Sequence, residues 1–597
     1  MSGFIVLHRL PGGPTVSSDS LSVLIQHTQH DRVATLQRGP FTVCVVSRWG
    51  PVEDLFQERE GELWIGCGHL MGMEGRYTFR EAFSSNLCGS QNWHEELRGH
   101  FAAARLAWTS GTISVATNRF GSVPVFWAQG PLGLVFATEL PACLIASGAS
   151  RDLDRVAVAE TIMLDVPLRD RTLFKAVKQL PAGCVARAAH GRVELQKYWY
   201  YRFYGGPRGA GTEIVSEASR LVKRAVSQCL PDSRPVLLFV SGGLDSRLIA
   251  GYALPKLKEA RTVSFGVKGA WDLIYGEQVS CLAGSKQHIA EHMHAWHYVE
   301  TSMEGVGLTG GMLSPAHFHM YGCLRRHYNP GEVVLTGFLG DPHFGANGRL
   351  DRSEPGNPRE VISAFLARFP NLTYEEITAL LGDEIYDAIR IDLEQVMKDC
   401  THSNLPSDYE EYYFIAERQP KLIIFINALC NTLEDVRMPF LDYELAEFLC
   451  SLPEKWRYER YIQKRLLIRD FPELARVPDS HVGAPLTASE TQKRLYLLRR
   501  KSLRGYQWVV EAISGGLVSP VYPRWSERHT ANLREELRGW FLSNLERLEA
   551  RELFRPRSLG YYRHPFLCSR YDMVRFRLIA LEQVLQWCQR WPRLESR

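Results

Sequence analysis

The sequence contains no G-x-x-x-x-G-K-[ST] motif, so it lacks the usual phosphate loop of kinases and NTPases. It also lacks a C-x-x-C pair: its thirteen cysteines are scattered singly, which is typical of reduced thiols rather than a disulfide framework. No apolar run approaches the length of a membrane span, and the segment after Met1 does not resemble a secretory signal. The small net charge of +4 argues against a dedicated nucleic-acid surface. We therefore expect a cytoplasmic protein with no membrane or nucleic-acid partner.

The length and the pattern of turns indicate several domains. A chain of 597 residues is too long for one ordinary hydrophobic core. Its first two hundred residues contain short strand patterns, with a helical pattern around 93–104. The predicted strands are residues 41–46, 63–67, 112–116, 125–127 and 133–137. The glycine-rich segment 205–211 is the natural boundary, so the expected domains are 1–205, 206–490 and 491–597.

One stretch combines a short apolar strand, a glycine turn and the start of a helix. Residues 236–240 predict a buried parallel strand, and the turn Ser-Gly-Gly-Leu-Asp-Ser follows at 241–246. Its two glycines, Gly242 and Gly243, let the backbone approach an anion. Ser241 and Ser246 offer hydroxyl donors, and the carboxylate of Asp245 can hold a divalent cation. The stretch predicts a phosphate-binding loop.

Strand and helix patterns alternate after this loop. Further strands are expected at 261–266, 297–300 and 332–336, and a helix at 275–291. Such alternation predicts a parallel sheet covered by helices on both faces, with ligands at the carboxyl ends of the strands. From residue 491 onward the pattern is that of amphipathic helices, in which the basic cluster 499–504 is either a solvated face or a site for an acidic peptide or partner.

Two further motifs fit known site patterns. His288-Ile-Ala-Glu-His292 matches the H-x-x-E-H zinc pattern, whose two histidines share one helix face. We prefer to interpret this segment as part of a covering helix and the strand that follows it, and a metal assay that finds no stoichiometric zinc would exclude the protease alternative. Gly305-Val-Gly-Leu-Thr-Gly310 matches G-x-G-x-x-G but does not follow a strand directly, so we interpret it as a flexible loop.

The turn at 241–246 resembles the pyrophosphate loop of ATP pyrophosphatases, and residues 117–127 and 134–140 resemble the amino-terminal half of asparagine synthetases. Glutamine-using members of that family begin with a cysteine nucleophile. Ser2 stands in its place here, and a serine hydroxyl is a much poorer nucleophile than a thiol. The resemblance implies an α/β protein: an inactive, glutaminase-like domain of the Ntn-hydrolase type, then an ATP-pyrophosphatase parallel-sheet synthetase domain with a helical extension.

The resemblance also implies roles for residues outside the first loop. Val263 lies where the family lines its adenine pocket, and Gly337 lies in the counterpart of its second nucleotide motif. Asp341, in the same motif, would join Asp245 around Mg²⁺, although Pro342 replaces the glutamate that usually follows.

Two later segments complete the resemblance. Lys464 lies on the segment that matches the helix of the family's catalytic lysine, with Arg465 as the alternative. Arg437 and Asp442 belong to a second signature and are either a structural ion pair or substrate contacts.

Within this superfamily the chain is most similar to lasso peptide cyclases, because of its Gly-Phe-Leu-Gly-Asp-Pro loop at 337–342, its segment 438–445 and its long helical tail. This similarity implies that ATP and Mg²⁺ serve to adenylate an aspartate or glutamate side chain of a linear core peptide, which the peptide's own amine then attacks. It also implies a leader peptidase and a leader-recognition protein as partners. The alternatives are an ammonia-dependent asparagine synthetase, a β-lactam synthetase-like enzyme, or a non-catalytic nucleotide-binding protein.

Overall fold

The computed structural model describes residues 3–9, 16–28, 30–71, 76–84, 90–203, 209, 211–345, 358–400, 405–514, 533–563 and 571–591. Met1 and Ser2, on which the expected loss of glutaminase activity depends, lie outside this set, as does most of the predicted joint at 205–211. In the described ranges no helix is both long and apolar enough to cross a membrane.

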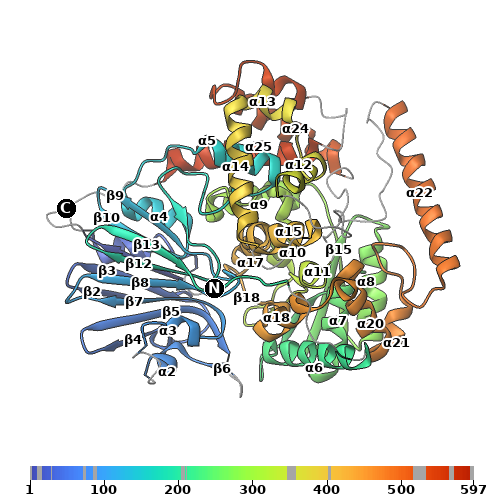
Figure 1. The fold of residues 1–597 in the computed structure, drawn as a ribbon, viewed down its shortest axis with the longest axis horizontal. Helices are drawn as coiled ribbons and strands as arrows, with labels where there is room; N and C mark the ends of the chain where they lie inside the picture. Colours follow the sequence, from blue (N-terminus) through green and yellow to red (C-terminus); the bar gives the residue numbers. More distant parts are fainter. Residues whose placement is uncertain are drawn as a thin grey trace.

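Two stacked antiparallel sheets form the amino-terminal half (Figure 1). The first sheet has the order β11 (Lys178–Gln179), β9 (Phe126–Gly130), β10 (Gly133–Ala137), β1 (Gly3–His8), β3 (Phe41–Ser47) and β2 (Arg32–Arg38). The second has the order β13 (Arg192–Lys197), β12 (Cys184–Ala189), β8 (Thr112–Thr117), β7 (Gly99–Ala107), β5 (Glu62–Met71) and β4 (Phe56–Arg59), with β6 (Arg76–Tyr77) beside β5. Short helices flank them: α1 (Ser18–Ser22), α2 (Phe79–Ser84), α3 (Trp93–Glu96), α4 (Leu140–Ser147) and α5 (Arg155–Leu164).

The alternation of side chains along β1 explains the layering. Phe4 and Val6 lie in the core between the two sheets, whereas Ile5 and Leu7 point to the opposite face. That opposite face belongs to a hydrophobic core which continues through α4 and α5 into the carboxyl-terminal half, where rings of Phe126 and Phe425 lie 6.0 Å apart. The two halves therefore share one core.

The helix predicted around 93–104 is wrong over most of its length. Helix α3 ends at Glu96, and the alanine-rich run that follows forms β7, paired on both sides with β5 and β8. Alanine favours helices in isolation, but Ala102, Ala103 and Ala104 are fully buried on the two faces of this central strand, where side-chain packing overrides local propensity. The strands predicted at 41–46, 63–67, 112–116 and 133–137 are confirmed.

A five-stranded, all-parallel sheet is the centre of the carboxyl-terminal half. Its order is β16 (Gln287–His292), β15 (Ala260–Gly266), β14 (Val236–Phe239), β17 (Val333–Leu335) and β18 (Asp435–Arg437). One face is covered by α6 (Gly211–Cys229), α7 (Leu244–Ala253), α8 (Trp271–Leu282), α18 (Tyr443–Ser451), α20 (Tyr461–Asp470) and α21 (Pro472–Arg476). The other is covered by α9 (Trp296–Thr309), α10 (His319–His327) and α17 (Ile423–Cys430).

Two predictions within this half are wrong. The helix expected at 275–291 ends at Leu282, and residues 287–292 form the edge strand β16 instead. Residues 297–300, expected as a strand, lie in α9. On a strand, His288 and His292 are about 13 Å apart, which is too far for both to bind one zinc ion.

The glycines at 305–310 are also not a flexible loop, since they form the last turns of α9. A Cβ on Gly305 would lie 2.7 Å from the ring of Phe318, and one on Gly307 would lie 2.1 Å from the ring of Trp587. These glycines let aromatic side chains pack directly against the helix backbone.

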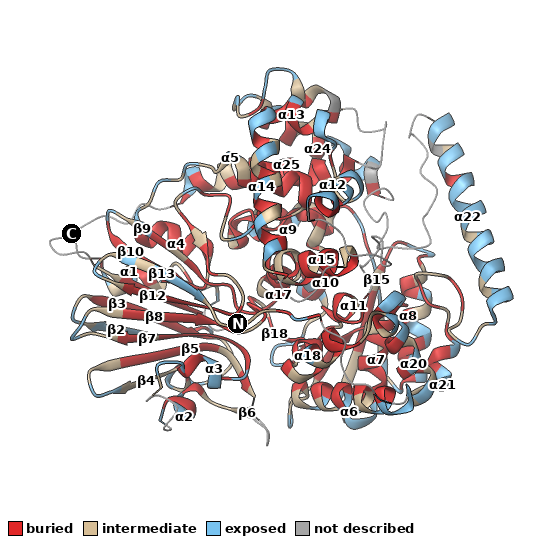
Figure 2. Ribbon diagram, in the orientation of Figure 1, coloured by how far each residue is buried: buried red, intermediate tan, exposed pale blue. Residues whose placement is uncertain are grey.

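The remaining helices surround this sheet at one end and extend the chain. They are α11 (Gly340–His343), α12 (Pro358–Arg368), α13 (Tyr374–Leu381), α14 (Asp383–Lys398), α15 (Pro406–Tyr412), a π-helical turn (Tyr413–Arg418), α16 (Gln419–Lys421), α19 (Glu454–Arg457), α22 (Glu490–Ile513), α24 (Arg534–Glu549) and α25 (Asp572–Arg590). The helical tail predicted from residue 491 is confirmed where the structure describes it. Helix α22 stands apart from the body, and most of its surface is exposed (Figure 2).

Candidate active site

The turn between β14 and α7 lies at the carboxyl end of the central strand of the parallel sheet. Internal hydrogen bonds set its shape: the N–H of Ser241 donates to Oγ of Ser246 at 3.0 Å, and the N–H of Gly243 donates to Oγ of Ser241 at 3.1 Å. Gly243 is the N-cap of α7, so the helix directs its first free N–H groups at this turn. The turn has the geometry of an anion-binding loop.

A buried arginine supports the turn from behind. Arg247 is fully buried on α7, and its guanidinium donates to the carbonyl oxygens of Gly242 and Leu474, both at 2.9 Å. Gly242 itself packs against a later loop, since a Cβ there would lie 2.8 Å from Cβ of Ser480. These contacts fix the turn before any ligand arrives.

A cavity of about 370 Å³ opens over this turn. It brings together six of the predicted residues: Ser241, Gly243, Asp245, Ser246, Gly337 and Asp341. Phe239, Phe265, His317, His319, Thr336, Phe338, Arg460 and His481 are further members of its lining. The space is deep enough for a nucleotide-sized ligand.

Val263 does not line the cavity. It is fully buried in register with Phe239 of the neighbouring strand, and Phe265, two residues further along β15, is the one that reaches the cavity wall. The wall also carries the hydroxyl of Thr336, which is buried and has no hydrogen-bond partner in the described part of the chain. Sequence reasoning missed Phe265, although it lies within the predicted strand.

Asp245 and Asp341 meet at the floor of the cavity. The N–H of Asp341 donates to Oδ2 of Asp245 at 2.9 Å. The second loop wraps tightly around Asp245, because a Cβ on Gly340 would lie 2.4 Å from its carboxyl carbon. Leu339 takes a left-handed conformation, with φ of 69°, to make this bend. Burial, and then the nearby charge of Asp341, raise the pKa of Asp245 well above its usual range.

These two carboxylates fit Mg²⁺. Hard oxygen donors suit this ion, which proteins often hold through one or two carboxylates while the phosphates of a substrate complete the shell. A cation between them would also relieve the repulsion that raises the pKa of Asp245. The site offers two carboxylates, and the described ranges contain no group of three or more histidine, cysteine, aspartate or glutamate side chains arranged to hold a metal ion.

Sequence reasoning missed Arg460, which lines the cavity, and Gln463, which contacts Asp245. Nη1 of Arg460 lies 2.9 Å from Oδ1 of Asp341, and its Nη2 lies 3.7 Å from the buried Asp479. Gln463 donates from Nε2 to Oδ1 of Asp245. The signal for Gln463 was its place beside the predicted lysine on α20, whereas nothing in the sequence pairs Arg460 with Asp341.

Lys464 follows Gln463 on α20 and is half-buried, whereas Arg465 is exposed. Burial, and then the charge of Arg460, lower the pKa of Lys464. Its side chain lies outside the cavity lining, one position beyond the residue that touches Asp245. Of the two basic residues considered, Lys464 is the one with a desolvated environment.

Arg437 and Asp442 do not form the ion pair that was one of the two predictions for them. Nη2 of Arg437 pairs with Asp435 at 2.5 Å, and Asp442 pairs with Arg224 at 2.5 Å while it caps α18 through the N–H of Leu445. Each residue is held by a different structural partner because β18 and α18 point them in different directions.

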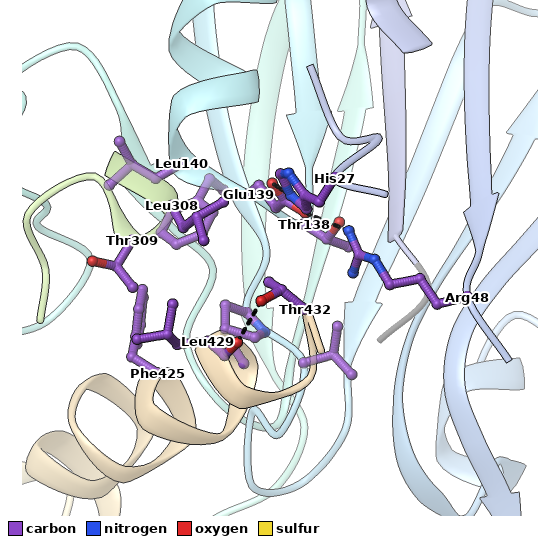
Figure 3. Close-up of a pocket in the computed structure, with 14 residues that line it drawn as sticks. His27, Arg48, Thr138, Glu139, Leu140, Leu308, Thr309, Phe425, Leu429 and Thr432 are labelled. Carbon is purple, nitrogen blue, oxygen red and sulfur yellow. Dashed lines mark hydrogen bonds and ion pairs between the residues drawn. The ribbon is translucent and has the colours of Figure 1, made fainter. Parts of the chain in front are cut away.

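A second, smaller cavity of about 50 Å³ lies where the two halves meet (Figure 3). His27, Arg48 and Glu139 lie on its amino-terminal side, and Leu308, Phe425 and Leu429 line the opposite side. Nε2 of His27 lies 2.8 Å from Glu139. Burial opposes ionisation of Glu139, but the charges of His27 and Arg48 outweigh it and lower its pKa. The cavity holds a compact charge cluster at the interface of the two halves.

Two family models match the chain. The glutamine amidotransferase domain matches residues 84–199, and asparagine synthase matches residues 217–482. A Mycobacterium tuberculosis (strain ATCC 25618 / H37Rv) protein, whose name proposes a glutamine-hydrolyzing asparagine synthetase, is 27% identical over 273 residues, 43% of this chain and 42% of that protein. Asparagine synthetase 2 of Bacillus subtilis (strain 168), also named glutamine-hydrolyzing, is 21% identical over 463 residues, 70% of this chain and 60% of its own.

One solved structure, titled as the allosteric regulatory enzyme of purine biosynthesis, shares 11% identity at a TM-score of 0.25, covering 49% of this chain and 80% of its own. That score is too low to add to the fold. The chain spans about two fifths of the length of the first curated relatives it matches.

Proposed function

We propose that this chain, which joins an amidotransferase-type domain to an asparagine synthase-type domain with a parallel sheet, is an ATP-dependent, AMP-forming amide ligase. The observation that carries the proposal is the pair Asp245 and Asp341 at the floor of the cavity over an anion-binding turn, where the N–H of Asp341 donates to the carboxylate of Asp245 at 2.9 Å. A free carboxylate does not acylate an amine in water, so the reaction needs such a site to activate it.

Different residues of the cavity would bind the phosphates, the Mg²⁺ ion and the nucleobase of ATP. The N–H groups at the start of α7 and the hydroxyl of Ser246 face the cavity and would hold phosphate oxygens. Asp245 and Asp341 would hold Mg²⁺, which when bound neutralises phosphate charge and favours departure of pyrophosphate. Phe239 and Phe265, whose rings meet edge to face, offer apolar aromatic surface for a nucleobase.

Arg460 and Lys464 would act on developing negative charge. Arg460 is fixed by Asp341 and Asp479 on one side of the cavity floor. Lys464, half-buried and of lowered pKa, is a cation whose effect is little screened by water. Together they would stabilise the acyl adenylate as it forms and as it is broken by an amine.

For the substrate, we propose the side-chain carboxylate of an aspartate or glutamate in a linear core peptide, joined to that peptide's own amino terminus as a macrolactam. The support is the similarity of the loop at 337–342, of the segment 438–445 and of the helical tail to lasso peptide cyclases. Holding both ends of one peptide replaces a bimolecular step with an intramolecular one. In well-oriented cases this change lowers the activation barrier by up to roughly 7–11 kcal/mol. A leader peptidase and a leader-recognition protein would supply the peptide.

The test is mass spectrometry of a leaderless candidate peptide incubated with the protein, ATP and Mg²⁺, with AMP measured in parallel. Loss of one water with matching AMP, abolished in Asp245→Ala, is the expected result. AMP formed only with free aspartate and ammonia would instead support the asparagine synthetase alternative, which the names of the relatives favour. No AMP under any condition, with the partner proteins also supplied, would overturn the ligase proposal in favour of a nucleotide-binding protein.

A further inference from the structure

A third cavity, of about 310 Å³, is separate from the phosphate-binding turn and from the small cavity between the two halves. We call it the aromatic pocket. Its lining is Met163, Leu164, Asp165, Phe365, Phe369, Tyr413, Phe414 and Arg418. The rings form a connected set, with Phe365 and Tyr413 4.7 Å apart and Phe369 and Phe414 5.7 Å apart. Such a wall suits a flat or bulky apolar group.

A π-helical turn presents one side of this pocket. The turn spans Tyr413–Arg418, and its first, second and last residues all reach the pocket. Single π-turns inside helical segments are rare, cost hydrogen-bond geometry and occur frequently at functional sites. The hydroxyl of Tyr413 donates to the carbonyl of Leu164 at 3.2 Å, which ties this turn to the end of α5.

The polar end of the pocket carries an excess of positive charge. Two guanidinium groups share the carboxylate of Asp165: Nη2 of Arg418 lies 3.2 Å from Oδ2, and Nε of Arg577 lies 3.6 Å from Oδ1. The three side chains together carry one net positive charge. Glu417, the acidic neighbour of Arg418 in sequence, is turned away to Lys421 at 3.1 Å.

The excess positive charge destabilises the fold because Arg577 is almost wholly buried and its charge is removed from water. Its Nη2 has no hydrogen-bond partner in the part of the chain that the structure describes. Burial, opposed by Asp165 and reinforced by the charge of Arg418, lowers the pKa of Arg577 to about 10. An anion placed beside Arg418 would restore neutrality to this cluster.

The same cluster borders the adenylation cavity. His317, which lines that cavity, has its pKa lowered by burial and then by the charge of Arg577, and its buried Nε2 is without a partner among the described residues. His317 therefore links the charge cluster of the aromatic pocket to the lining of the cavity in which we propose carboxylate activation.

We propose that the aromatic pocket binds the carboxyl-terminal residue of the peptide substrate, with an aromatic or large apolar side chain against the rings and the terminal carboxylate at Arg418. The naming of a peptide rests on the proposed function, whereas the preference for an apolar carboxylate rests on the pocket alone. The pocket would hold the tail of the peptide while its reactive groups lie in the adjacent cavity.

The test measures binding without ATP, by ligand-observed NMR on the full-length protein. The probes are N-acetylphenylalanine, its uncharged amide, and N-acetylglycine. We expect the first to bind about tenfold more tightly than either of the others, since one charge-assisted hydrogen bond is worth at least 1.4 kcal/mol. No binding of N-acetylphenylalanine, or equal binding of acid and amide, would overturn the proposal.

Arg418→Gln should bring the acid and the amide to within about twofold of each other, because it removes the charge while Arg577 still pairs with Asp165. The matched control is Arg390→Gln, which removes an exposed arginine of α14 paired with Glu394 and should leave the preference intact. Should Arg418→Gln fail to fold by thermal melting, Phe369→Leu provides the second variant and should weaken N-acetylphenylalanine selectively. Unchanged probe binding in a folded Arg418→Gln protein would refute the assignment.

A separate assay keeps this proposal distinct from the ligase proposal. With a cyclisable peptide, amidation of its carboxyl terminus should raise KM in the wild type and not in Arg418→Gln, with kcat little changed. If AMP never forms but N-acetylphenylalanine still binds through Arg418, the ligase proposal fails and the pocket stands. If AMP forms and KM is the same for the free and the amidated peptide, the pocket assignment is wrong while the ligase proposal stands.

Discussion

The N–H of Asp341 donates a 2.9 Å hydrogen bond to Oδ2 of Asp245, although the two residues are 96 positions apart in the chain. This bond brings two carboxylates together at the carboxyl ends of neighbouring strands, with Arg460 and Gln463 on their outer oxygens. The repulsion between the two carboxylates is opposed by the charge of Arg460 and by hydrogen bonds from Gln463 and from the N–H of Asp341. Changing any of these contacts should have a measurable effect.

Asp245→Asn should abolish AMP release, with a loss of about 100-fold or more, because the amide no longer attracts a divalent cation. Thermal melting checks the cause: Mg²⁺ with ATP should raise the melting midpoint of the wild type and not that of the variant. Retention of that midpoint shift in Asp245→Asn would contradict the metal site.

The same variant tests the pKa of Asp245. Its folded pKa is raised, so the neutral form stabilises the fold at low pH, and that contribution is lost as pH rises through the raised pKa. Without Mg²⁺, Asp245→Asn should therefore gain stability relative to the wild type as pH increases. A stability difference that does not change with pH, measured by urea unfolding, would contradict this sign.

Gly340→Ala should impair turnover although both carboxylates, Asp341 and Asp245, are still present in the variant. The added Cβ would lie 2.4 Å from the carboxyl group of Asp245 and must displace it. We expect at least about tenfold slower AMP formation, since small misplacements at such a site are costly. Gly539→Ala on α24, where a Cβ meets nothing within 4 Å, is the matched control and should be active.

Lys464→Met should lower kcat by roughly 100-fold with little change in KM for ATP, because it removes a desolvated cation that acts on developing charge. Arg465→Met, at the exposed neighbouring position, should stay within a few-fold of the wild type. Pyrophosphate release under saturating ATP measures both variants. The reverse order of effects would move the role to Arg465.

Glu160→Gln should stabilise the protein above neutral pH. Burial, and then the charge of Asp392, raise the pKa of Glu160 to about 8 despite the N–H of Leu168 at 2.9 Å. The protonated wild-type side chain stabilises the fold below its unfolded pKa, and this contribution is lost as pH rises through about 8, at about 1.4 kcal/mol per pKa unit.

Urea unfolding of Glu160→Gln and the wild type at about pH 5, 7 and 9 checks this, since the gap should grow with pH and then level off. The exposed Glu194→Gln on β13 provides the control and should show no such trend.

The sequence predicted the phosphate-binding turn and its parallel strand because those features are local: a short apolar run, two glycines and the start of a helix. The resemblance to asparagine synthetases implied that Asp341 lies beside Asp245, and the structure brings the two residues together after neighbouring strands of one parallel sheet. The sequence did not predict Arg460, which reaches the site from a segment where Glu459 and Arg460 both take positive φ, of 48° and 61°. Local patterns do not encode such a bend, because tertiary contacts impose it.

Two of the wrong elements have a common cause. Alanine-rich β7 and histidine-containing β16 both lie where a neighbouring strand, rather than the local sequence, decides the conformation. The ion pair between Arg437 and Asp442, one of the two roles predicted for them, does not form, because Arg437 pairs with Asp435 and Asp442 pairs with Arg224.

The core that runs from the outer face of the first sheet through α4 and α5 to α17 and α25 has an evolutionary consequence. A gene fragment that encoded residues 206–597 alone would expose Phe425 and its apolar neighbours to water, and its product would aggregate rather than fold. Natural selection can therefore retain the amidotransferase-type half as a structural subunit even in a lineage where its own chemistry has been lost. Substitutions in that half are then selected for folding rather than for catalysis.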